Sequence, residues 1–418
     1  MTMLAFSRAP VPLPEGMDQT GYIARFGGAL ATRDKPEMKI LLLKEPMGEE
    51  HILIFCDLLG FSPARTKLLE KRLAARFSLS PENILITCTH THSAPASMSL
   101  LLLGECRDSW FYAFEHALFD AVQTAREEGY APARFSFGKT EVEGVARNRV
   151  KQNLTDIDPD ETVLYLETKK RRIALVNFSC HPVTKNADNR RYSRDYPGIV
   201  ADTLIENGAA DEVIFATAPC GDINPVLQDE PGKDDRMLEY GRAIAKSVSS
   251  LISSGALMET EGFSMEKRTL SLPLMPDHDR ADLSSLARRS RINHQNAADP
   301  VKKKYEEANY LYARSHERLK ELGLSETAFP VTVSILKFGA LTVFCVPFEL
   351  FSGIGVHLKQ AAFPACVWEL SGGDFGYFPS DDLWEEAAYE RADAYMYYNR
   401  GGPLPKGSEG KLLEELLR

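Results

Sequence analysis

The chain is organised around one short stretch, which reads Thr87-Cys88-Thr89-His90-Thr91-His92-Ser93-Ala94-Pro95 and holds two of the nine histidines. The apolar run before it, 83–86, follows a Ser-Pro turn at 80–81 and predicts a short buried strand. If the strand continues to the pair, His90 and His92 point to the same face, because side chains two residues apart do so in a strand. Two imidazoles in one cavity can bind a metal ion or transfer protons. The alternative is a pair of histidines in a surface loop.

The composition is that of an ordinary globular protein, with 418 residues of which 44% are hydrophobic and 26% charged. The net charge of -10 argues against a nucleic-acid partner, because phosphate binding needs clustered Lys and Arg. No apolar stretch is long enough to span a membrane, and the first residues lack the pattern of a signal peptide. We therefore expect a cytoplasmic protein without stable membrane insertion. The seven cysteines form no C-x-x-C pair, which suits free thiols.

Hydrophobic periodicity predicts an α/β fold with mixed sheets flanked by helices. The expected strands are 38–43, 52–56, 83–86, 134–138, 162–167, 173–178, 213–216, 331–338, 341–346 and 365–368. The expected helices are 63–77, 108–127, 197–207 and 237–251. Ser62 and Pro63 are a typical cap and first helical residue for the first of these helices.

Two regions carry weaker patterns. Residues 1 to about 36 are rich in Gly and Pro, and we expect only a loose approach to the fold there. Residues 277–322 are highly charged, with helical periodicity on both sides of Pro300. They predict an exposed helical hairpin, which could serve as a lid or simply as a solvated outer layer. We expect a single large domain over 1–418 that includes this helical insertion.

Several predicted strands and turns end in a residue capable of metal or proton chemistry, and these residues are His90, His181, Asp222 and Glu349. In open α/β sheets, ligands gather beyond the carboxyl ends of the strands, so residues far apart in sequence can converge there. Two histidines and one carboxylate form a common catalytic zinc set, which leaves one position open. The alternative for each residue is a capping or hydrogen-bonding role at a strand end.

Taken together, these motifs resemble the catalytic N-terminal domain of the neutral ceramidases, a family of zinc-dependent amide hydrolases. The resemblance runs from about Gly21 to the end of the chain. Thr89-His90-Thr91-His92-Ser93 is similar to the family's Thr-His-Thr-His-Ser-Gly-Pro, with Ala94 in place of Gly. The other matching segments are His181-Pro182, Val346-Pro347-Phe348-Glu349, Gly376-Tyr377-Phe378-Pro379 followed by Tyr389, and Asn148-Arg149.

Carried over to this chain, the resemblance implies a ceramidase-like fold and a zinc ion held by His90, His181, Glu349 and Tyr377. It further implies that three side chains donate hydrogen bonds to a developing oxyanion, namely His92, Arg149 and Tyr389. Zinc accepts imidazole and carboxylate ligands readily, and a nearby cation lowers the pKa of a phenol toward the phenolate form. Arginine stays charged and offers a fixed fork of donors to a polarised carbonyl.

One departure from the family changes the expected reaction. The ceramidase turn Gly-Asp-x-Ser-Pro supplies a serine nucleophile, whereas this chain reads Gly221-Asp222-Ile223-Asn224-Pro225. Asn224 cannot attack, so the simplest replacement is water activated by zinc, with Asn224 orienting water or substrate. The general base is unassigned, with Asp222 and Asp195 as candidates. Cys220 is a conceivable nucleophile, although a structural thiol at a strand end is the simpler interpretation.

We therefore expect a zinc-dependent hydrolase of an amide (N-acyl) or related acyl bond. Its substrate would be a small molecule, for example an N-acylated compound. The family's C-terminal immunoglobulin-like domain and secretion signal have no counterpart in these residues, which weakens the assignment of a lipid substrate. Two alternatives stay open: a zinc hydrolase of an ester, lactone or phosphoester, and a non-catalytic protein that binds a metal or ligand. The sequence does not decide whether the chain forms a homo-oligomer.

Overall fold

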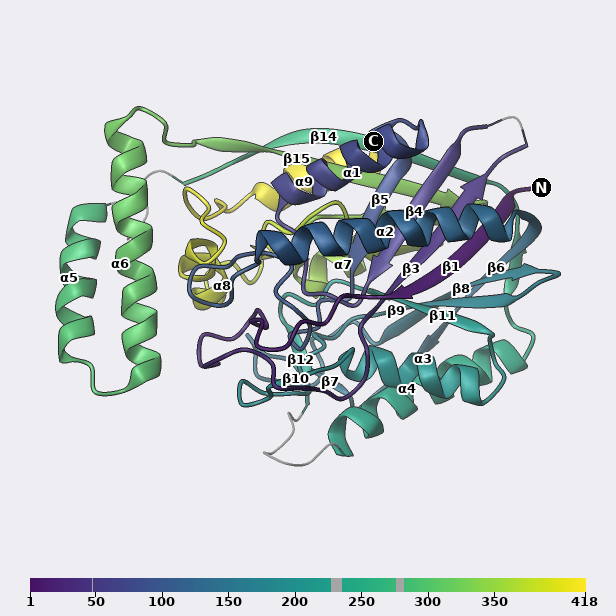
Figure 1. Ribbon diagram of the computed structural model, residues 1–418, viewed down its shortest axis with the longest axis horizontal. Coiled ribbons are helices and arrows are strands. Elements are labelled where there is room, and N and C mark those ends of the chain that lie inside the picture. Colours follow the sequence, from purple (N-terminus) through teal and green to yellow (C-terminus); the bar gives the residue numbers. More distant parts are fainter. Residues whose placement is uncertain (47, 227–234, 276–281) are drawn as a thin grey trace.

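A nine-stranded mixed sheet forms the centre of the fold in the computed structural model, which describes residues 1–46, 48–226, 235–275 and 282–418 (Figure 1). The strand order is β11-β9-β8-β6-β1-β3-β4-β5, with β13 paired to β6. In that order the bounds are Glu212–Thr217, Arg172–Phe178, Asp160–Thr168, Ala131–Glu141, Met3–Pro10, Glu37–Lys44, Glu50–Cys56 and Ile84–Cys88, with β13 at Met258–Thr260. A second sheet has the order β14-β15-β16-β18, with bounds Phe263–Pro273, Ala328–Phe338, Leu341–Cys345 and Ala365–Trp368.

The two sheets pack face to face because the large sheet is apolar on both sides. In β3, Leu41 and Leu43 face Leu336 and Phe338 of the second sheet, whereas Ile40 on the opposite side packs under helices. This alternation gives each strand one face toward the second sheet and one toward a helical layer.

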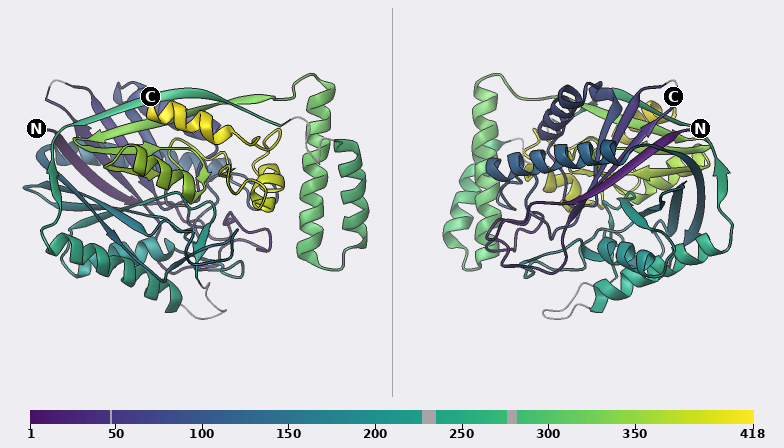
Figure 2. Two further views of the ribbon diagram at one scale, coloured as in Figure 1. Left: turned by 180° about the vertical axis from the view of Figure 1, so that it is seen from behind. Right: turned by 45° about the vertical axis from the view of Figure 1, so that its right-hand side comes forward.

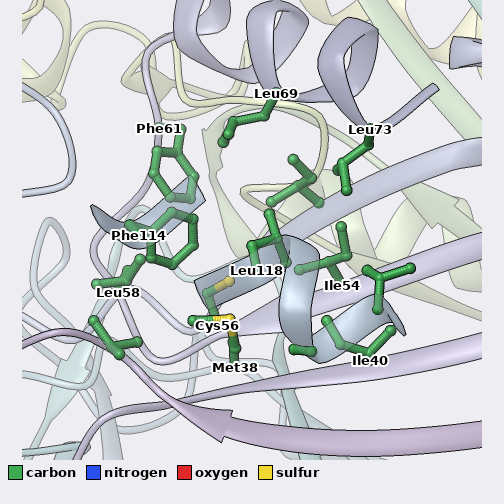
Figure 3. Close-up of a cluster of buried hydrophobic side chains, with 14 of the residues drawn as sticks. Met38, Ile40, Ile54, Cys56, Leu58, Phe61, Leu69, Leu73, Phe114 and Leu118 are labelled. Atoms are coloured by element: carbon green, nitrogen blue, oxygen red, sulfur yellow. The ribbon is translucent and has the colours of Figure 1, made fainter. Parts of the chain in front are cut away.

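Helices cover the outer faces of both sheets. On the large sheet lie α1 (Pro63–Phe77), α2 (Asp108–Glu128), α3 (Asp195–Glu206) and α4 (Asp235–Ser253), and on the second sheet lie α7 (Ser352–Ala361) and α9 (Ser408–Leu417). Figure 3 shows the α1 and α2 side of this core, where Leu69, Leu73, Phe114 and Leu118 point toward Ile54. The result is an αββα sandwich.

The expected elements are confirmed. The predicted strands and helices all occur with bounds within a few residues of those expected, and α1 begins at Pro63 as expected. The Ser62 side chain, however, makes no capping hydrogen bond, so only the proline part of the expected start signal is confirmed. The structure corrects the interpretation of the N-terminal segment, because β1 lies inside the large sheet between β3 and β6. The residues at 3–6 are apolar and buried, but a Pro-rich stretch follows them. The Gly and Pro content of residues 1–36 taken as a whole therefore did not indicate this strand.

The charged region forms a helical hairpin of α5 (Leu283–Asn296) and α6 (Pro300–Glu321), and its first residues, 277–281, lie outside the described residues. The hairpin stands at one end of the sandwich, beside α8 (Ala388–Ala392) and the 3₁₀ turn η2 (Ala394–Met396) (Figures 1 and 2). No helix in the described parts of the chain is long and apolar enough to cross a membrane.

Short strand pairs complete the structure: β2 (Ala31–Thr32) with β10 (Arg191–Tyr192), β7 (Ala146–Asn148) with β12 (Ile223–Pro225), and β17 (Glu349–Leu350) with β19 (Tyr377–Phe378). The segment after β18 joins the two edges of the large sheet. The Glu369 amide donates to the Thr217 carbonyl at the end of β11, and the Cys88 amide at the end of β5 donates to the Leu370 carbonyl. Strand ends that are distant in sequence therefore meet at one place.

Candidate metal centre

Three of the predicted strand-end residues converge at this meeting point. His90 follows β5, His181 follows β9, and Glu349 begins β17. Glu349 Oε2 lies 3.3 Å from His90 Nε2 and 3.1 Å from His181 Nε2. All three side chains are at most 1% exposed, so the cluster is shielded from solvent.

Backbone carbonyl groups fix the orientation of both imidazole rings. His90 Nδ1 lies 2.8 Å from the Leu59 carbonyl oxygen, and His181 Nδ1 lies 2.6 Å from that of Cys220. Because a carbonyl oxygen only accepts, each Nδ1 carries the proton, and in a neutral ring Nε2 then holds a lone pair. Such carbonyl contacts are typical of histidines that bind metal ions.

The two Nε2 atoms and Glu349 Oε2 would repel one another if nothing lay between them. Two imidazole lone pairs and a carboxylate oxygen at these distances need a shared proton or a cation. Burial lowers the pKa of His90, but the carboxylate of Glu349 outweighs it and raises that pKa to about 9. Burial lowers the pKa of His181 to about 4, which keeps this ring neutral. A divalent metal ion fits this donor set of imidazoles and one carboxylate.

His90 reaches this position through an unusual backbone conformation. Strand β5 ends at Cys88, and His90 has a φ of +69°, which non-glycine residues rarely adopt. The strand therefore does not continue to His92, and strand alternation is not what places the two histidines together. The two rings nevertheless lie together, with centroids 5.0 Å apart.

His92 completes a group of three histidines that could hold a metal ion. One nitrogen from each of His90, His92 and His181 lies within 4.8 Å of the others. The His92 ring is buried, and neither nitrogen has a hydrogen-bond partner among the described residues. Burial and the neighbouring His90 hold the pKa of His92 well below its usual value, so the ring is neutral. It can donate one hydrogen bond and accept another.

Gly21 provides the space for His92. Its φ is +113°, and a Cβ atom at this position would lie 2.2 Å from His92 Nδ1. Only glycine fits both the conformation and the contact.

The second oxygen of Glu349 is held by Tyr398, whose hydroxyl donates a hydrogen bond to Glu349 Oε1. Glu369 holds strand β17, which contains Glu349, through a hydrogen bond to the next residue. It accepts hydrogen bonds from the Leu350 amide at 3.0 Å and from the Cys220 amide at 3.1 Å. Since the Cys220 carbonyl orients His181, Glu369 links the supports of His181 and Glu349.

Tyr377 and Arg149 border the cluster. Tyr377 pairs with Glu349 in the parallel β17–β19 ladder, and its ring stacks on His181 with centroids 6.4 Å apart. The Arg149 guanidinium carbon lies 5.0 Å from the centre of the Tyr377 ring. Burial lowers the pKa of Arg149, but Tyr377 and Glu390 outweigh burial, so Arg149 stays charged.

Asn224 and Tyr389 lie beside this pair. Arg149 Nη1 donates to Asn224 Oδ1 at 3.3 Å, and the Tyr389 ring lies 6.0 Å from that of Tyr377. Tyr389 is 43% exposed, which places it at the solvent side of the cluster. The structure therefore gathers the predicted ligands and the predicted donors in one region.

The two candidate bases make extensive internal contacts instead. Asp222 accepts hydrogen bonds from Asn148 Nδ2 at 2.8 Å and from the Ser352 amide at 2.7 Å, and burial raises its pKa to about 6. Asp195 accepts from Thr184 Oγ1 at 2.6 Å and from the Tyr196 amide at 2.7 Å. These contacts hold the turn at 221–225 and the loop at 184–195 in place.

Cys220 has the properties of a structural thiol. It is fully buried, and its Sγ donates to Glu369 Oε1 at 2.9 Å. Burial and the nearby Glu369 carboxyl raise its pKa well above the usual value, which disfavours the nucleophilic thiolate.

Two residues of the centre were missed by sequence reasoning, Tyr398 and Glu369. Tyr398 belongs to an aromatic series in the C-terminal part of the chain, and Glu369 is a charged residue directly after the buried strand β18. A charge at the end of a core strand is the one pattern that could have indicated Glu369.

Comparison with known proteins identifies the fold that holds this centre. No family model matches the chain, and a search of curated proteins gave no match. Among solved structures, a neutral ceramidase from Pseudomonas aeruginosa matches with a TM-score of 0.71 at 16% identity, covering all of this chain and 74% of that one. A second structure, described as a ceramidase complexed with C2, matches with a TM-score of 0.73 at the same identity and coverage. The chain therefore has the fold of the neutral ceramidases over its whole length.

Proposed function

We propose that this protein is a zinc-dependent hydrolase of amide (N-acyl) or related acyl bonds. The observation that carries the proposal is the arrangement of His90 and His181, whose Nε2 atoms both face Glu349 Oε2. Imidazole nitrogen and carboxylate oxygen are preferred zinc ligands, and Tyr377 would add the fourth. When bound, zinc would polarise the acyl carbonyl and lower the pKa of a water molecule to about 7.

The chain's own residues would bind and orient the substrate. Arg149 carries a fixed positive charge, and the nitrogens of His92 have no hydrogen-bond partner in the described part of the chain, so both side chains can donate to an acyl oxygen as it gains charge. Tyr389, at the solvent side, would supply a third donor. The Asn224 side chain cannot act as a nucleophile, because an amide nitrogen is too weak a nucleophile. It is held by Arg149, and its amide group would orient the substrate through hydrogen bonds. We assign Asp222 and Asp195 to positioning rather than to proton transfer.

The substrate class rests on structural likeness and on the site. The structural neighbours carry the name ceramidase, and a ceramide holds an N-acyl bond. Asn224 at the position of the family's serine favours direct attack by water over an acyl-enzyme. Esters, lactones and phosphoesters are the alternative substrates, because the same chemistry hydrolyses them. A binding protein without activity is the alternative outside enzymes.

A substrate screen tests the proposal. Zinc-loaded protein would be assayed against panels of N-acyl amides, esters, lactones and phosphoesters, with His181→Ala as the control for contaminating activity. We expect turnover of an N-acyl compound that is lost in His181→Ala. Turnover confined to another panel would replace the amide assignment. Zero turnover in all panels, from protein that holds zinc, would favour the binding role.

A further inference from the structure

Arg25 donates hydrogen bonds to two chain segments that meet beside His92. Its Nη1 donates to the His92 carbonyl oxygen at 2.6 Å. On the other side, Nε and Nη2 donate to the carbonyl oxygens of Ala187 and Asn186 at 3.4 Å and 3.5 Å. The Arg25 side chain is buried. One enclosed guanidinium therefore joins the segment that carries His92 to the loop at 184–195.

The guanidinium keeps its positive charge in this buried position. Burial lowers the pKa of Arg25, but only to about 10, so the group is charged at neutral pH. Its Cζ atom lies over the Tyr22 ring, 4.9 Å from the ring centre, and the aromatic face stabilises the cation together with the three carbonyl groups. A charged donor holds a carbonyl oxygen more strongly than a neutral donor does. The contact with the His92 main chain is therefore of the stronger kind.

Tyr22 places the same N-terminal segment against the His92 ring itself. The two rings meet edge to face, with centroids 4.9 Å apart, and the Tyr22 hydroxyl donates to the Lys185 carbonyl oxygen at 2.8 Å. Gly21, next to Tyr22, leaves the space that the His92 ring occupies. The segment thus contacts both the ring and the main chain of this histidine.

These contacts matter because the His92 ring has no hydrogen bond of its own. The rings of His90 and His181 are each oriented by a backbone carbonyl oxygen at Nδ1. Neither nitrogen of His92 has such a partner in the described ranges of the chain. The position of this ring therefore depends on how its main chain is held and on what packs against it.

The helical hairpin holds the Arg25 segment from the opposite side. Lys304, on helix α6, donates from Nζ to the Arg25 carbonyl oxygen at 3.0 Å. This contact links the charged hairpin to the segment that supports His92, so the hairpin is more than a solvated outer layer.

We propose that Arg25 is a positioning residue for His92. It holds the His92 main chain so that one ring nitrogen stays within 4.8 Å of the facing nitrogens of His90 and His181, where an acyl oxygen would lie. The effect on turnover rests on the proposed function, whereas the effect on the His92 ring rests on the contacts alone. Because Arg25 would act through His92, its loss should matter only while His92 is present.

A double-mutant cycle tests this dependence, using zinc-loaded protein and a substrate identified in the screen. We expect Arg25→Met to lower kcat by about tenfold to a hundredfold with little change in KM, because a displaced donor is missed in the transition state. In the His92→Ala background, the same substitution should change kcat by less than about twofold. Arg107→Met is the matched control, since exposed Arg107 also donates to a backbone carbonyl, that of Gly16. It should keep the wild-type kcat.

Arg25→Lys repeats the cycle with a milder change, in case Arg25→Met does not fold. Lysine keeps the charge and can donate to the His92 carbonyl, but it cannot reach both segments with a fixed fork of donors. We therefore expect a smaller loss of kcat than in Arg25→Met, again only while His92 is present.

Histidine side-chain NMR tests the positioning without any substrate. In protein with isotope-labelled histidine, the His92 signal is the one that disappears in His92→Ala. It should shift in Arg25→Met or Arg25→Lys and stay in place in Arg107→Met. An unchanged His92 signal would overturn the proposal, as would equal losses of kcat with and without His92. If no substrate panel gave turnover, the proposed function would fail, and the NMR signal would still decide the role of Arg25.

Discussion

His181 and Cys220 are joined by a 2.6 Å contact between the imidazole Nδ1 and the Cys220 carbonyl oxygen. This contact fixes the ring so that Nε2 faces Glu349, and it ties the histidine to the turn at 221–225 that carries Asn224. Ligand geometry and the substrate side of the centre are therefore set by one backbone segment.

Removing the Tyr398 hydroxyl should weaken metal binding without unfolding the protein. Tyr398→Phe deletes the hydrogen bond to Glu349 Oε1 and lets the carboxylate rotate. Loss of such a supporting contact typically costs about 10- to 100-fold in metal affinity. Competition with a chromophoric zinc chelator would measure the change, with Tyr112→Phe, an exposed tyrosine on α2, as the control. Equal zinc affinities of the two variants would refute the supporting role.

A methyl group at Gly21 should displace His92. In Gly21→Ala, the Cβ atom would meet His92 Nδ1, and the φ of +113° would add strain of about 1 to 3 kcal/mol. We expect lower thermal stability and a large loss of turnover, with zinc content unchanged. Gly16→Ala is the control that separates backbone strain from the clash with His92. Its φ is +71°, so strain is added there too, but its Cβ atom would have no neighbour within 4 Å. If both variants lost turnover equally, the contact with His92 would not matter.

Asn224→Ala should keep the metal and change the reaction. The side chain accepts a hydrogen bond from Arg149 and, within the described parts of the chain, forms none with the three histidines, so zinc content should equal that of wild-type protein. Turnover of a substrate identified in the screen should fall by about 10- to 100-fold, as expected for loss of one orienting hydrogen bond in the transition state. Full activity in this variant would remove Asn224 from the mechanism.

Stability should fall as the pH rises from about 4 to about 8, because Glu161 is buried in its protonated form. Burial raises the pKa of Glu161 to about 8, only partly opposed by a hydrogen bond from Ser247. The raised pKa means that the folded state holds the proton more tightly. This stabilisation is complete below the unfolded pKa of about 4.3 and is lost through pH 8, by up to about 1.4 kcal/mol per unit.

Glu161→Gln should flatten this dependence, because glutamine keeps the shape but cannot ionise. Denaturant unfolding at pH 5, 7 and 9 would measure it, with Glu143→Gln, an exposed residue, as the control. Parallel pH profiles for wild-type protein and Glu161→Gln would contradict the assignment.

The sequence predicted the parts of the centre that follow strong local patterns. His90 and His181 come within a few residues of the ends of apolar strands, and α1 begins at Pro63, so local sequence patterns were sufficient to predict them. Tyr398 and Glu369 act through contacts with residues far away in the chain, at 349 and 220, which no spacing reveals. For the candidate bases, the sequence position suggested a catalytic role that the contacts do not favour. Asp195 ends a polar loop, but its carboxylate accepts a hydrogen bond from Thr184 and holds that loop in place.

The central claim is that His90, His181 and Glu349 hold a zinc ion, and zinc stoichiometry measured by elemental analysis tests it most directly. Wild-type protein dialysed against zinc and then buffer should hold about one equivalent per chain. The His116→Ala, His357→Ala double variant, which removes two exposed histidines, should hold the same amount. The His90→Ala, His181→Ala double variant should hold less than about a tenth of an equivalent. Stoichiometric zinc in that last variant, or none in wild-type protein, would contradict the account.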